Sequence, residues 1–142
     1  MMRSPTAPLI LGLAGLIPFV IGTLTTLGWL PTLWGFGGPL MALSYGTVIL
    51  CFMSGVLWGF ATKAEGHQAA IGYSLSVIPA LWAFFMPGDG LSSAVIYKVV
   101  GFVGLLMLDY QFSVWGLTPK WWMKLRVLLT SIVVLCLLGL LI

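Results

Sequence analysis

The residues that could carry chemistry are few, and the most informative is an acidic residue at the end of an apolar run. Asp109 follows the stretch GFVGLLML, and Arg126 lies about one turn into the next apolar run along the chain. An acidic side chain near a lipid bilayer is costly unless it is paired or hydrated. The connection between the two runs is long enough for their ends to meet. We predict an Asp109–Arg126 ion pair that joins two helices; separate hydration of the two side chains among lipid headgroups is the alternative.

A second ionisable residue, Lys98, precedes Asp109 in the same apolar run. At 100° per residue the two side chains fall within about 20° of one another around a helix, and about 16 Å apart along it. Together they could form a polar stripe that faces a cavity or pathway, which is a common role of ionisable residues inside a membrane. However, Lys98 lies only about two turns from the outer end of its helix. We therefore favour extension of its long side chain to the outer interface.

Two sets of uncharged residues could contact a partner or a ligand. Gly55 and Gly59 have the G-x-x-x-G spacing, which makes a flat strip on which another helix backbone can pack closely. In a chain with several spans, such a strip favours packing within the chain over a homodimer. Aromatic side chains at interior helix positions, together with Lys98 and Asp109, could instead surround a small apolar ligand. These aromatic residues are Tyr45, Trp58, Tyr73 and Trp82.

The remaining residues do not form a catalytic or metal-binding set. His67 is the only histidine, and a zinc site needs three or four N, S or O ligands in a cluster. Cys51 and Cys136 lie far apart inside apolar runs, so we expect buried free thiols rather than a disulfide. Neither a G-x-S-x-G elbow nor a P-loop is present. We therefore expect no enzyme activity, no metal and no cofactor.

The composition places these residues in a membrane protein. Of the 142 residues, 61% are hydrophobic and 6% charged, and the mean hydropathy is +1.14. A soluble domain averages about 25% charged residues, so this chain could not cover a surface that faces water. Six Lys and Arg against three Asp and Glu are too few for the basic patch that nucleic-acid binding requires. The expected surroundings are therefore the lipid bilayer, without nucleic acid.

Five segments are long and apolar enough for membrane-spanning helices, which need about 20 residues. The first resembles a signal peptide only superficially, because its apolar run is too long and no A-x-A site follows, so we expect it to be retained as a span. Pro18 and Pro79 fall inside spans and predict kinks. The sequence predicts an all-α fold, a single transmembrane domain over 1–142, with helices at about 8–29, 39–61, 69–86, 91–110 and 124–142.

The distribution of Lys and Arg predicts the orientation, because these residues are enriched in cytoplasmic loops. With five spans, one side of the membrane holds Arg3, Lys63, Lys120, Lys124 and Arg126, and the connections on the opposite side hold neither residue type. We expect the N-terminus inside and the C-terminus outside, in a bacterial inner (cytoplasmic) membrane, or in the mitochondrial inner membrane of a eukaryote. Three tryptophans are expected at headgroup depth on the inner side: Trp115, Trp121 and Trp122.

Several motifs, taken in chain order, resemble the family of transmembrane protein 69. They are GLAGLIPFVIGTL, SYGTVILCFMSGVLWGFA, SVIPALWAFFM, GFVGLLMLDYQF and LTPKWWMKLRVLLTSIVVL. The resemblance extends from Gly12 to about Leu135, and its most specific parts are S-G-x-x-W-G at 54–59 and P-x-W-x-x-x-L-R at 119–126. It implies five helices, an energy-transducing inner membrane and no established activity. Leu57 departs from the family pattern, which often has Arg or His at this position, so no polar role is carried over to it.

Two functions fit these observations. The first is an accessory or assembly partner of a larger inner-membrane complex, because the chain has no ligand-type cluster and carries glycine-lined faces suited to helix packing. The second is a binder or carrier of a small apolar molecule such as a quinone, a lipid or a haem precursor. It rests on the interior aromatic residues together with Lys98 and Asp109. The sequence favours the first slightly.

Overall fold

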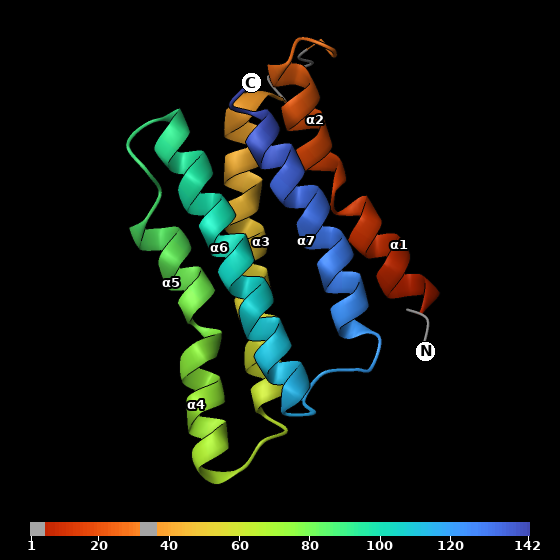
Figure 1. Cartoon of the computed structure of the whole chain (residues 1–142), viewed down its shortest axis with the longest axis vertical. Helices are drawn as coiled ribbons and strands as arrows, with labels where there is room; N and C mark the ends of the chain where they lie inside the picture. Colours follow the sequence, from red (N-terminus) through yellow and green to blue (C-terminus); the bar gives the residue numbers. More distant parts are fainter. Residues whose placement is uncertain (1–4, 32–36) are drawn as a thin grey trace.

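The computed structural model of this chain describes residues 5–31 and 37–142, and in these ranges the regular structure is entirely helical. Figure 1 shows the helices arranged as an elongated bundle of rods. Five stretches are long and apolar enough to cross a membrane, which confirms the predicted fold class. Their helices are α1 (Thr6–Ala14) with α2 (Ile17–Thr26), α3 (Gly38–Ala61), α4 (Gly66–Ser76) with α5 (Ile78–Phe85), α6 (Leu91–Val114), and α7 (Trp122–Gly139).

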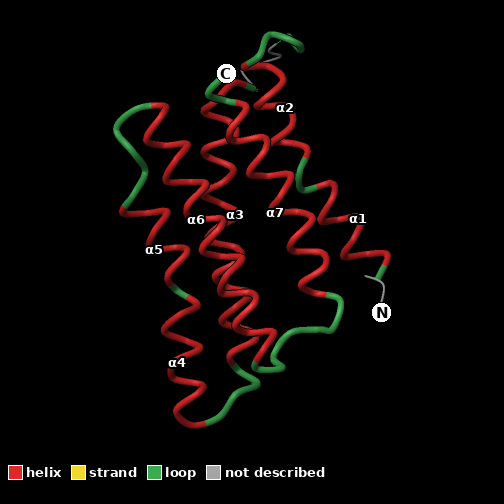
Figure 2. The backbone as a smooth tube through the Cα atoms, in the orientation of Figure 1, coloured by secondary structure: helices red, strands yellow, loops and turns green. Residues whose placement is uncertain are grey.

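Two of the five spans are interrupted in their middle, where proline was predicted to kink them. Figure 2 shows the interruptions as short non-helical stretches between α1 and α2 and between α4 and α5. Pro18 and Pro79 occupy the first turns of α2 and α5, because proline lacks an N–H and clashes with the preceding turn of a continuous helix. The second break is bridged from a neighbouring helix, since the backbone N–H of Ala80 donates to Ser54 Oγ of α3 at 2.9 Å.

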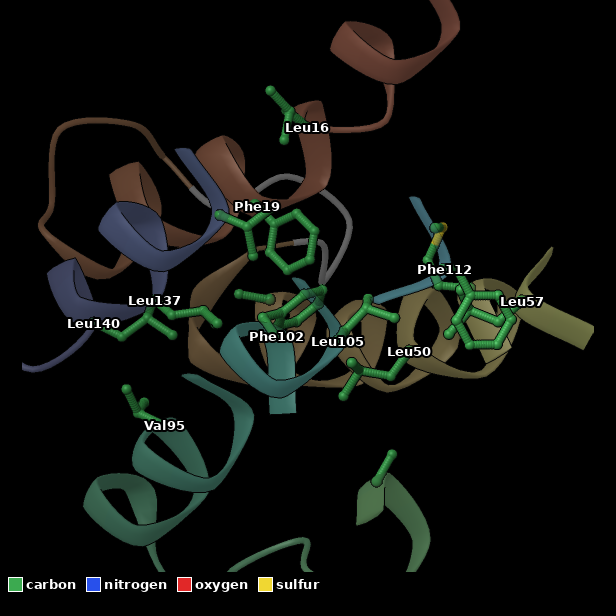
Figure 3. Packing of buried hydrophobic residues seen from close by; sticks show 14 of the residues in the cluster. Leu16, Phe19, Leu50, Leu57, Val95, Phe102, Leu105, Phe112, Leu137 and Leu140 are labelled. Atoms are coloured by element: carbon green, nitrogen blue, oxygen red, sulfur yellow. The ribbon is translucent and has the colours of Figure 1, made fainter. Parts of the chain in front are cut away.

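α3 is the central rod of the bundle. It packs against α2, α4, α5 and α6, whereas α7 packs mainly against α6 and the first span. Figure 3 shows the core between these rods, where Phe19 of α2 meets Phe102 of α6 beside Leu50 and Leu105. The Phe19 and Phe102 ring centroids are 5.9 Å apart in an edge-to-face arrangement, which aromatic pairs prefer. Phe19 and Phe102 are both 1% exposed, so this pair belongs to the buried core.

The ends of the bundle separate the connections into two groups. The C-terminus lies at the end that carries the α2–α3 and α5–α6 connections, and the α3–α4 and α6–α7 connections lie at the opposite end (Figure 1). Lys63 Nζ donates to the Leu117 carbonyl at 3.4 Å, which joins the latter two connections. Lys63 and Lys120 therefore share one end, as the predicted orientation requires. Arg3 lies outside the described residues, and which end faces the cytoplasm stays a prediction.

The strip formed by Gly55 and Gly59 does not pack inside the chain, so this prediction was wrong. Both residues are exposed, and a Cβ added to either would meet nothing within 4 Å. Cys51, one turn earlier, is exposed on the same helix, although it was expected to be buried. The close approaches of α3 use other small residues. A Cβ added to Gly22 of α2 would lie 2.9 Å from the Cβ of Ala42 on α3. These contacts fix the rotation of α3 and turn the strip outward.

Candidate functional site

The predicted ion pair is present between α6 and α7. Arg126 Nε donates to Asp109 Oδ2 at 2.8 Å. Asp109 is fully buried and Arg126 is 5% exposed. α6 continues one turn beyond its predicted end, to Val114, and the chain then reverses through Gly116, whose φ of 75° favours glycine. This reversal places the first turns of α7 beside Asp109.

Trp122 completes this site, a role that the sequence interpretation missed. Its Nε1 donates to Asp109 Oδ1 at 2.9 Å, so each carboxylate oxygen has a donor. The residue was predicted only as part of an aromatic belt. Its spacing of four from Arg126 on a helix was a usable signal, because residues at i and i+4 share a face. The Phe60 ring packs edge-on against Trp122 with centroids 5.1 Å apart, which holds the indole in place.

A groove of about 590 Å³ opens beside this ion pair, and Arg126 forms part of its wall. The groove lies between the first span, α3 and α7. α1 has no buried residue and packs mainly against α7 at the edge of the bundle (Figure 1), which leaves space between α1 and α3. Leu11 and Phe52 line the groove and are 71% and 65% exposed, so it opens at the lipid-facing surface. Its lining is predominantly apolar.

Two polar atoms at this groove lack a partner. Within residues 5–31 and 37–142, Arg126 Nη2 and Thr130 Oγ1 are the buried side-chain N or O atoms without a hydrogen bond, and both residues line the groove. A helical threonine or serine can donate to the carbonyl three or four residues earlier, as Ser131 does to Val127 at 2.7 Å. Thr130 does not. Buried donors without partners cost free energy, so the pair indicates a site that accepts a hydrogen-bonding group.

Lys98 neither reaches the outer interface nor forms a stripe with Asp109. It is 4% exposed, and its Nζ donates to Thr47 Oγ1 of α3 at 2.6 Å. The side chain lies against Gly46, where a Cβ would be 3.2 Å from the lysine Cγ. The missing side chain at Gly46 therefore leaves room for Lys98 inside the bundle. Phe102, which is 1% exposed, lies between Lys98 and Asp109 on the same face of α6, so the two ionisable groups occupy separate places.

The four aromatic residues do not surround one ligand, contrary to the hypothesis from the sequence. Tyr45 lines the groove and packs edge-on against Phe19 with centroids 5.1 Å apart. Trp58 and Tyr73 form a pair at 4.6 Å on the surface between α3 and α4, with Trp58 49% exposed. Trp82 Nε1 donates to the Tyr97 carbonyl at 2.7 Å, which ties α5 to α6. Only Tyr45 of this set belongs to the groove.

The structure defines a class: a multi-pass α-helical membrane protein with five spans and a lateral groove beside a buried ion pair. The chain belongs to the family described as "Protein of unknown function (DUF3429)", whose model matches residues 4–142. No solved structure matches it.

The chain is also similar to two vertebrate proteins named Transmembrane protein 69, the family that the sequence motifs predicted. It is 34% identical to the one from Xenopus tropicalis over 143 residues, covering 96% of this chain and 54% of the relative. It is 27% identical to the one from Mus musculus over 139 residues, covering 93% and 54%. The chain thus spans about half the length of the curated relatives it matches.

Proposed function

We propose that this protein binds a hydrocarbon-chain molecule of the membrane in the groove between α1, α3 and α7, without catalysing a reaction. The observation that carries the proposal is the combination of an apolar groove of about 590 Å³ with two unpartnered buried polar atoms that belong to residues of its wall. Small-molecule sites are typically concave and mostly apolar, with volumes of about 300–1,000 Å³ and a few polar groups that fix orientation.

The position of the groove supports a ligand that arrives from the bilayer. Leu11 of α1 and Phe52 of α3 are both exposed where the groove opens. A molecule with an apolar chain could therefore enter sideways, with its chain against the apolar lining and its polar end near Arg126. This arrangement favours the ligand-binding hypothesis over the accessory role that the sequence slightly favoured.

The experiment is a comparison of two tryptophan substitutions on α3. Val56 lines the groove, whereas Val48 is 60% exposed and is not among the groove residues, so it serves as the matched control. Each variant is purified in a mild detergent, and its co-purifying lipids and quinones are extracted and quantified by mass spectrometry. We expect Val56→Trp to lose a stoichiometric molecule that wild type and Val48→Trp retain. Equal recovery from all three proteins would exclude this groove as the binding site.

The accessory or assembly role remains as a second candidate, because the strip of Gly55 and Gly59 faces outward with open space above it. A helix of a larger inner-membrane complex could approach the backbone there. The test is Gly55→Leu with the Val48→Leu substitution as control, each followed by native gel electrophoresis of solubilised membranes. Loss of a high-mass band in Gly55→Leu alone would support this role, and migration of the wild type without any partner would count against it.

A further inference from the structure

The wall of the groove identifies the chemistry of the polar end of the ligand. We infer that the groove takes a lipid-soluble molecule whose head is an uncharged carbonyl, such as a quinone or an ester, and that Arg126 and Thr130 donate to this oxygen. The inference rests on the proposed function, since it specifies the ligand of the same groove.

The two unpartnered atoms can both act as donors to one acceptor. Arg126 Nη2 carries N–H groups only, and the Thr130 hydroxyl rotates to donate where an acceptor lies. The two residues are four apart on α7, so their side chains are neighbours on one face of the helix. A carbonyl oxygen has two lone pairs. Both atoms are closed to a water-sized group in this conformation. One such oxygen can therefore satisfy both atoms once neighbouring side chains of the groove move to uncover them.

The charge of the site favours a neutral head over an anionic one. Among the lining residues within 5–31 and 37–142, Arg126 is the only formally charged one, and Asp109 already compensates it through the bond from Nε at 2.8 Å. A carboxylate or phosphate at Nη2 would add a negative charge to a pair with no net charge. Burial of an uncompensated charge in apolar surroundings is costly. Lys120 is exposed on the α6–α7 connection and does not line the groove, so it does not compensate an anion there.

Asp109 and Trp122 act as positioning residues in this arrangement. Asp109 fixes the guanidinium through Nε, and the Trp122 indole occupies the other carboxylate oxygen. Nη2 is then left without a partner on a residue that lines the groove. The ion pair thus does more than join two helices, because it holds the guanidinium beside the groove.

The test compares chains that differ only in their head. Tritiated methyl palmitate, tritiated palmitate and tritiated hexadecane are measured for binding to detergent-solubilised protein by scintillation proximity at a pH where the acid is ionised. The amount of each tritiated compound that the Val56→Trp variant binds defines the background of the assay. We expect methyl palmitate to bind more tightly than palmitate or hexadecane. Thr130→Val removes one neutral hydrogen bond and should weaken the ester about threefold to tenfold, while hexadecane is unaffected.

A matched substitution and a stability measurement separate this role from a structural one. Ser131 lies next to Thr130 on the exposed face of α7. Ser131→Ala should therefore change neither the affinity for methyl palmitate nor that for hexadecane. Thr130→Val should also raise the melting temperature of the protein without added ester, because it removes a buried unpartnered hydroxyl. Opposite effects on stability and on affinity are not expected of a residue that serves packing alone.

The outcomes distinguish failure of the inference from failure of the proposed function. Tighter binding of palmitate than of the ester, or affinities that Thr130→Val leaves unchanged, would overturn the neutral-carbonyl head while the groove remains a chain-binding site. Binding that Val56→Trp does not reduce would overturn the proposed function itself. Competition by decylubiquinone then separates the two kinds of ligand. If decylubiquinone displaces the tritiated ester at a lower concentration than unlabelled methyl palmitate does, the ligand is a quinone. If it requires a higher concentration, the ligand is an ester lipid.

Discussion

Removing Arg126 from the ion pair should destabilise the protein more than removing Asp109. Removal of one partner of a buried pair typically costs about 3–5 kcal/mol, because the other charge is left uncompensated. Arg126→Met leaves the fully buried Asp109 with the Trp122 indole as its remaining donor. We therefore expect this variant to lose about 3–5 kcal/mol of stability. Asp109→Leu should cost less, about 1–3 kcal/mol, since the long arginine side chain lies one turn from the start of α7 and can extend toward the interface.

The double variant Asp109→Leu with Arg126→Met is the decisive member of the series. Replacement of a buried ion pair by apolar residues of similar volume is often neutral or stabilising, so we expect stability within about 1 kcal/mol of wild type. A charge swap is a poorer test of this pair. With arginine at 109, the Trp122 N–H would face a guanidinium that cannot accept a hydrogen bond, so the swap should recover only part of the loss.

The assay is unfolding by SDS in mixed micelles, followed by circular dichroism and analysed as a double-mutant cycle. Lys120→Met is the control for loss of a cation at the same end of the bundle; Lys120 is exposed, so its removal should change stability by less than about 0.5 kcal/mol. Two results would refute the reasoning. One is an Arg126→Met variant as stable as Lys120→Met, and the other is a double variant whose loss equals the sum of the two single losses.

Two further predictions concern α6. Lys98→Met should cost less than about 1 kcal/mol, whereas Thr47→Val, which leaves the buried amine without its acceptor, should cost about 1–3 kcal/mol; the reverse order in SDS unfolding would mean that Lys98 stabilises through another contact. Gly101→Ala should destabilise by about 1–3 kcal/mol, because its Cβ would lie 2.9 Å from Trp82 Cδ1. Gly104→Ala has nothing within 4 Å and should stabilise by about 0.5–1 kcal/mol, so equal melting temperatures for the two alanine variants would contradict the packing.

The features of the structure that the lipid bilayer imposes were predictable from the sequence. Apolar length fixes the five spans, because a bilayer must be crossed by helices whose backbone bonds are satisfied internally. Proline at 18 and 79 placed the two breaks. The ion pair could be predicted because ionisable residues are scarce here, so an acidic residue beside a membrane has few possible partners.

The rotations and tilts of the helices could not be predicted in the same way. The G-x-x-x-G spacing predicts a flat strip but not the direction that it faces, and close packing at Gly22 and Ala42 turned the strip at Gly55 outward. In the same way, Lys98 is accommodated by space at Gly46, a residue 52 positions away in the sequence. The groove depends on the direction of α1 relative to α2 across the break, which no local pattern specifies.

The lateral opening between Leu11 and Phe52 changes how an affinity for this protein must be expressed. A molecule that enters through this opening exchanges with the bilayer and never passes through water, so its effective concentration is its mole fraction among the surrounding lipids. Every neighbouring lipid is then a competitor at nearly constant excess. An abundant membrane component can occupy the groove with a modest preference, whereas a rare one must be preferred over bulk lipid by roughly the inverse of its abundance. Under the proposed function, the occupant in the cell would therefore be set as much by the composition of the host membrane as by the contacts inside the groove.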